Sequence, residues 1–139
     1  LLHAHTLEDW GIDKLAAKMR EEMQEELGHA GAFIDRILFL GGTPQLEATK
    51  SPKMAESLKA LFEADKAEEG GAIKFYTKAA REAFESDDIG TRALFERIVQ
   101  DEEGHWEWLD LQLDLLEKLG IPVFMTNYMS GRSGGEGAA

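Results

Sequence analysis

The hydrophobic positions of this chain recur every three or four residues, which is the spacing of one face of an α-helix. The first long apolar stripe begins at Leu15 and ends at Leu40, where the Gly41-Gly42 pair follows. A second stripe runs from Leu61 to Ala79 and a third from Leu94 to Leu116. Because no segment shows the strict alternation typical of strands, the pattern predicts three long helices.

Shorter elements are predicted around these three helices. Residues 1–10 form an amphipathic segment that breaks at Gly11, and Asp13 is expected to cap the helix that follows. The segment 43–52 predicts a crossover, with Ser51 as the next cap and Pro52 in the first helical turn. The stretch VFMTNYM, residues 123–129, predicts a short terminal helix.

Long helices with one apolar stripe each are typical of a helix bundle. The segment 1–10 has the pattern expected for the end of a fourth bundle helix. We therefore expect one domain over residues 1–129, with a flexible Gly-rich tail over residues 130–139. The crossover has some ten residues, so the first two long helices need not be antiparallel neighbours.

Polar side chains interrupt all three stripes. Glu26 and His29 lie one turn apart on the first stripe, and Glu102 and His105 have the same spacing on the third. Glu68 falls on the second stripe when residues are counted from Leu61. An ionised carboxylate inside a bundle costs several kcal/mol unless it is paired or bound to a metal.

These five residues together favour a dinuclear metal site. Two iron ions require oxygen ligands, a shared carboxylate and an imidazole each, which this set supplies. The alternatives are a salt-bridged polar core, or helix faces displaced by one residue that point to solvent. The neighbouring Glu25, Glu69 and Glu103 lie about 100° from the stripes, so they are expected in solvent or in surface ion pairs. Gly28 and Gly104, which precede the histidines, are expected to allow close helix approach or to leave room for an ion.

Composition narrows the possible functions. The net charge of −12 argues against nucleic acid and against an anionic membrane surface as partners. The absence of cysteine excludes thiolate zinc sites and iron–sulfur clusters, so a metal must be held by carboxylates and imidazoles. No apolar run reaches the length of a membrane span, and we expect a cytoplasmic protein.

Two stretches carry a resemblance to a known family. REEMQEELGHAGAFIDRILFLGGTP and DEEGHWEWLDLQLDLLEKLG closely resemble bacterioferritin, and the similarity extends over nearly the whole chain. The resemblance implies an all-α, ferritin-like four-helix bundle with a short C-terminal fifth helix. It also implies a 24-subunit shell, pure or mixed, that stores ferric mineral. The implied activity is that of a ferroxidase, which oxidises Fe(II) with dioxygen or peroxide at a di-iron centre.

The resemblance also implies which residues bind the iron ions. Glu26, His29, Glu68, Glu102 and His105 match the family's ligands for two iron ions per subunit. The family's first-helix glutamate would lie roughly eight residues before Leu1, so we expect this chain to lack most of that helix.

Haem-binding bacterioferritins place a methionine directly after the glutamate of the first Glu-x-x-His motif. This chain has Leu27 at that position. Met23 lies one turn earlier and is expected to make an apolar contact. The subunit is therefore not expected to supply the usual haem ligand.

Two other functions remain open at this point. One is a different di-iron or di-manganese oxidoreductase, such as a rubrerythrin-type peroxidase, although no Cys-x-x-Cys domain is present. The other is a non-catalytic shell subunit that assembles with haem-binding, active subunits.

Overall fold

The computed structural model describes residues 1–47 and 50–130. All regular secondary structure in these residues is helical: α1 (Leu2–Asp9), α2 (Asp13–Phe39), α3 (Leu58–Glu85), α4 (Ile89–Leu119) and α5 (Ile121–Thr126). The three predicted long helices and the two short ones are confirmed. The predicted Gly-rich tail lies outside the described residues, except for Ser130. Within the described segments, no helix is both long enough and apolar enough to cross a bilayer.

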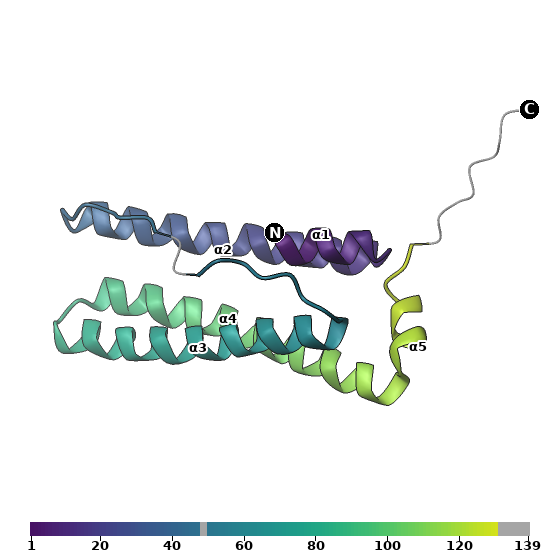
Figure 1. The fold of residues 1–139 in the computed structure, drawn as a ribbon. Helices are drawn as coiled ribbons and strands as arrows, with labels where there is room; N and C mark the ends of the chain where they lie inside the picture. Colours follow the sequence, from purple (N-terminus) through teal and green to yellow (C-terminus); the bar gives the residue numbers. More distant parts are fainter. Residues whose placement is uncertain (48–49, 131–139) are drawn as a thin grey trace, which may run out of the picture.

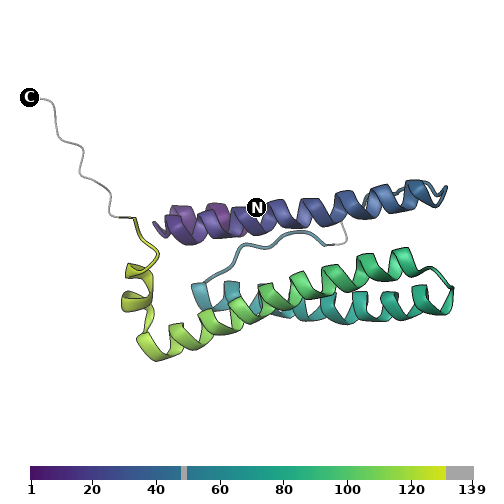
Figure 2. The same ribbon diagram turned by 180° about the vertical axis from the view of Figure 1, so that it is seen from behind.

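The helices form two layers (Figure 1). Helices α3 and α4 make a long antiparallel pair, and α2 lies over this pair with α1 beside its first turns. The chain returns along the bundle between α2 and α3, so these two helices run in the same direction. This agrees with the expectation, from the length of the crossover, that the first two long helices need not be antiparallel neighbours. Figure 2 shows the same layers from behind, with α5 turned across the end of the bundle.

The apolar core lies at the end of the bundle where α1 and α5 meet the long helices. Its fully buried side chains are Leu7, Ile12, Leu15, Leu61, Phe62, Leu109 and Phe124. Phe62 packs edge-on against Trp108 and Phe124, with ring centroids 6.1 and 6.0 Å away. At the opposite end of α2 the predicted stripe is exposed at Ile37 and Leu40. Burial is therefore concentrated at one end, and the polar residues of the stripes begin where this core ends.

A hydrogen-bonded clamp holds the other end of α2. The Arg36 guanidinium donates from Nη2 to Asp88 Oδ1 at 2.6 Å and from Nε to Thr91 Oγ1 at 2.9 Å. Asp88 is also the N-cap of α4 and accepts a hydrogen bond from the Thr91 amide. The apolar core and this clamp thus fix α2 against α4 on both sides of the polar region.

The predicted caps are wrong at two helices. Asp13 does not cap α2, because its carboxylate accepts from the Ser130 backbone amide at 2.7 Å instead. Helix α3 begins at Leu58 and not near Pro52, and Ser57 is its cap, with Oγ accepting from the Ala60 amide at 3.1 Å. Residues 51–55 have no regular structure. A serine followed by proline has the local signature of a helix start, but the packing of Leu58 and Phe62 fixes the actual one.

We expect Ser57→Ala to lower the free energy of unfolding by about 1 kcal/mol, the usual cost of losing a serine cap. Ser51→Ala is the matched control and should have an effect within about 0.5 kcal/mol, because Ser51 is exposed outside any helix. Denaturant unfolding of both variants at one protein concentration measures the difference. A larger effect at Ser51 than at Ser57 would contradict the observed helix start.

Candidate metal centre

Two members of the polar set come from the middle of α4. Glu102 has 2% of its surface exposed and His105 has 8%, so both face the bundle interior. They lie between the buried residues Ile98 and Leu109 on the same helix face, in agreement with the stripe counted from the sequence. Helix α4 therefore presents a carboxylate and an imidazole one turn apart to the space between the two layers.

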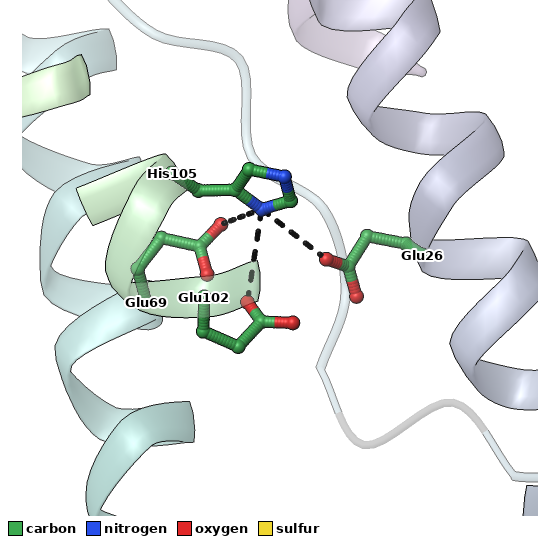
Figure 3. A group of neighbouring side chains, drawn as sticks. All are labelled: Glu26, Glu69, Glu102 and His105. Atoms are coloured by element: carbon green, nitrogen blue, oxygen red, sulfur yellow. Dashed lines mark ion pairs between the residues drawn. The ribbon is translucent and has the colours of Figure 1, made fainter. Parts of the chain in front are cut away.

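Three helices contribute to the acidic cluster around His105 (Figure 3). Glu26 from α2, Glu69 from α3, and Glu102 with His105 from α4 each offer one ligand atom, and these four atoms lie within 4.8 Å of one another. His105 Nδ1 is 3.8 Å from Glu26 Oε1, 3.9 Å from Glu69 Oε1 and 3.9 Å from Glu102 Oε2. A metal ion placed among them would receive three oxygen ligands and one nitrogen ligand.

His29 approaches the same carboxylates from α2. Its Nδ1 lies 3.1 Å from Glu102 Oε1 and 3.7 Å from Glu26 Oε1. Glu26 and Glu102 thus face both imidazoles, whereas Glu69 faces only His105. This arrangement matches the requirement of a dinuclear site, in which two carboxylates are shared between the ions.

The hydrogen bonding of the cluster fits the binding of a cation at this position. Within the described residues, His29 Nδ1, His105 Nδ1 and Glu102 Oε1 are buried and have no hydrogen-bond partner of acceptable geometry. Buried polar atoms without a partner are rare and costly in folded proteins. Carboxylate oxygens and imidazole nitrogens are suitable ligands for iron, so the residues present fit such an ion.

The electrostatics of the cluster lead to the same conclusion. Burial raises the pKa of Glu69 to about 10, and its hydrogen bond to Glu102 and the nearby charges of Glu102 and Glu26 add to the increase. Burial and the charge of Glu102 also raise the pKa of Glu26. Without a metal, the cluster retains a proton at neutral pH because three carboxylates cannot all ionise so close together. A divalent cation would replace that proton.

The raised pKa of Glu69 predicts how the stability of metal-free protein changes with pH. Between the ordinary value of 4.5 and about 10, the folded state holds a proton that the unfolded state has lost. Stability therefore falls as the pH rises through this interval. We expect the unfolding temperature in the presence of a chelator to decrease from pH 5.5 to pH 9. The decrease should be smaller in Glu69→Gln, and it should be unchanged in Glu68→Gln. Equal slopes in the two variants would contradict the assignment.

The structure corrects the predicted site at one position. Glu68 lies outside the cluster: its side chain is 67% exposed and Oε1 is 3.6 Å from Lys50 Nζ. Glu69, which was expected in solvent, has a side chain only 18% exposed and occupies the place predicted for Glu68. The count from Leu61 is wrong by one residue, because the buried face of α3 passes through Phe62 and Ala80. Counting backwards from Ala83 and Ala80 in helical steps would have reached Glu69.

The expectation of close helix contact at Gly28 and Gly104 is also wrong. A Cβ atom added at either position would meet nothing within 4 Å. By contrast, a Cβ at Gly70 would lie 3.7 Å from Trp106 Nε1, so Gly70 is the glycine that faces a neighbouring helix here. The glycines before the two histidines border open space.

Residues 1–119 match the family model described as a ferritin-like domain. The chain is 41% identical to bacterioferritin of Rhodobacter capsulatus over 123 residues, which cover 88% of this chain and 76% of that protein. The chain belongs to the bacterioferritin family.

Solved structures of the family show the same fold. A Rhodobacter capsulatus bacterioferritin, described as having a metal-free dinuclear site and a haem iron, superposes with a TM-score of 0.90 at 38% identity. That alignment covers 99% of this chain and 83% of the other. Mycobacterium tuberculosis bacterioferritin gives a TM-score of 0.88 at 35% identity, covering 93% and 81% of the two chains. The predicted all-α, ferritin-like four-helix bundle with a short C-terminal helix is confirmed.

The expected haem position of this bacterioferritin-family chain carries no ligand for iron. Leu27 follows Glu26 on α2, is 59% exposed and has only hydrocarbon in its side chain. Met23 is half-buried one turn earlier. The residues at this position therefore do not fit axial haem ligation by the usual methionine.

Proposed function

We propose that this chain is an iron-storage subunit that oxidises Fe(II) at the cluster between α2, α3 and α4. Membership of the bacterioferritin family supports iron storage. The observation that carries the oxidation site is the pair of imidazole Nδ1 atoms of His29 and His105, both buried without a partner and both facing Glu26 and Glu102. Such a set fits two iron ions that share two carboxylates.

Each residue has a distinct part in this proposal. His105 and Glu69 would bind one Fe(II), and His29 would bind the other. Glu26 and Glu102 would bridge the two ions and hold them close enough to react with one oxidant.

The bound Fe(II) pair supplies two electrons, one from each ion, when it is oxidised to Fe(III). Dioxygen takes up these electrons with two protons to give hydrogen peroxide, or hydrogen peroxide takes them up with two protons to give two waters. The carboxylates of Glu26, Glu69 and Glu102 would offset part of the positive charge of the two ions before and after oxidation. The carboxylate of Glu69, which holds a proton in the metal-free protein, releases that proton when Fe(II) enters.

Membership of the bacterioferritin family also supports proposals about the assembly and location of this subunit. We propose assembly into a 24-subunit shell, either of this chain alone or mixed with related subunits, with ferric mineral stored inside. The proposed location is the cytoplasm. We do not expect this subunit to ligate haem, because Leu27 stands at the relevant position.

Metal stoichiometry and iron oxidation test the proposal. The assembled protein should bind two Co(II) ions per subunit, a redox-stable substitute for Fe(II). It should also oxidise Fe(II) faster than buffer alone, with consumption of dioxygen or peroxide. Binding of fewer ions or oxidation at the buffer rate would refute the proposed site.

Glu69 and Glu68 provide a matched pair for the corrected assignment. Glu69→Ala removes a carboxylate that faces His105, so it should weaken one of the two Co(II) sites about 100-fold, an effect of about 3 kcal/mol. Glu68→Ala makes the same chemical change at an exposed neighbour and should leave both sites within about twofold of the native affinity. Titration followed by the visible absorption of Co(II) compares them. The reverse result would restore Glu68 as the ligand.

A further inference from the structure

The outer nitrogen of each site histidine also contacts a carboxylate. His105 Nε2 lies 2.7 Å from Glu25 Oε2, and His29 Nε2 lies 3.0 Å from Asp101 Oδ2. An ionised carboxylate can only accept a hydrogen bond, so these two contacts favour the tautomer that carries the imidazole proton at Nε2. The lone pair of Nδ1 then remains available on the side of the ring that faces the acidic cluster.

These outer contacts are crossed between the two helices. Glu25 belongs to α2 but contacts the histidine of α4, whereas Asp101 belongs to α4 but contacts the histidine of α2. Each outer acid directly precedes the glutamate of its own Glu-x-x-His motif, so EELGH and DEEGH have the same arrangement of acid, glutamate and histidine. The two motifs therefore contact each other across the interface between α2 and α4.

Burial does not account for this pairing. The side chains of Glu25 and Asp101 are half-exposed and would be well solvated if they turned outward. They contact the imidazoles from the solvent side. Two other exposed acids near the motifs, Glu21 and Glu103, make no hydrogen bond to either ring among the described residues.

We infer that Glu25 and Asp101 are positioning residues that fix the tautomer and ring direction of the partner helix's histidine for metal binding at Nδ1. The inference rests on the proposed function, because it assumes that Nδ1 is the ligand atom. Outer hydrogen bonds of this kind orient metal-binding histidines, and their loss typically weakens metal affinity about 10- to 100-fold.

The first test measures metal affinity in the full, assembled protein. Glu25→Ala and Asp101→Ala should each weaken Co(II) binding about 10- to 100-fold at one of the two sites. Glu25→Gln and Asp101→Asn keep an oxygen acceptor and should fall between the alanine variants and the native protein. Glu21→Ala and Glu103→Ala remove the same charge beside the motifs and serve as controls. All variants should unfold within a few degrees of the native protein when metal-free, which separates positioning from folding.

The second test observes the rings directly in metal-free protein. In solid-state nitrogen NMR, the native Nε2 atoms of both histidines should give the signal of a protonated nitrogen. Asp101→Ala should change only His29, and Glu25→Ala should change only His105, because the contacts are crossed.

The positioning role and the proposed metal function would be contradicted by different results. Unchanged ring signals, together with Co(II) affinities equal to those of the controls, would overturn the positioning role. A native protein that binds no Co(II) but shows the crossed ring changes would overturn the proposed metal function and leave the crossed orientation standing.

Discussion

Glu102→Ala is expected to abolish the metal centre. The Glu102 side chain is buried at the middle of the cluster, with Oε1 3.1 Å from His29 Nδ1 and Oε2 3.9 Å from His105 Nδ1. Since it faces both imidazoles, its removal affects both metal positions. Losing one charged contact at each position, worth about 3 kcal/mol, should weaken both Co(II) sites about 100-fold or more. Fe(II) oxidation should fall to the rate in buffer.

Glu103→Ala is the control for this prediction, because Glu103 is the exposed neighbour of Glu102 on the same helix. It should keep two Co(II) ions per subunit. Glu102→Gln retains the size of the side chain, so it is a second variant that separates loss of the ligand from a folding defect in Glu102→Ala. Metal-free Glu102→Gln should remain folded and still bind Co(II) poorly, because an amide is a weaker ligand than a carboxylate. Native affinity in both Glu102 variants would rule out a bridging role.

The second large effect is expected on stability. Phe62 is fully buried on α3 and packs edge-on against Trp108 and Phe124. Phe62→Ala leaves a cavity where α3, α4 and α5 meet, and such changes typically cost about 3–5 kcal/mol. We expect a corresponding fall in the denaturant midpoint of the metal-free protein, with little change in the slope of the transition.

Phe75→Ala is the matched control on the same helix. Phe75 is 66% exposed, so the change should be within about 1 kcal/mol. Protein concentration and metal content must be equal, because assembly and metal binding both shift apparent stability. If Phe75→Ala were the more destabilising variant in the dissociated subunit, the rotation of α3 described by the structure would be wrong.

The helices with strong apolar stripes could be predicted well from the sequence. On α4 the large residues Ile98, Leu109 and Leu116 define one face, and Glu102 with His105 falls unambiguously on it. On α2 the stripe placed Glu26 and His29 on the correct side. In both cases apolar residues on either side of the acid fix the helix face, so local periodicity is sufficient.

Helix α3 shows where local periodicity is insufficient. Between Phe62 and Tyr76 its residues are mostly small or charged, so two faces separated by one residue satisfy the same spacing. One residue corresponds to a rotation of about 100°, which decides whether Glu68 or Glu69 faces the cluster. That rotation is set by contacts distant in sequence, such as Phe62 with Phe124 and Gly70 with Trp106.

The sequence by itself determined that this is a helical bundle of the bacterioferritin type, with two Glu-x-x-His motifs facing its interior, because these features depend on residues a few positions apart. Only the tertiary structure decided that Glu69 joins the cluster and that Glu25 and Asp101 contact the histidines of the opposite helix. These facts depend on how α2, α3 and α4 are rotated against one another, and that rotation is fixed by packing between residues far apart along the chain.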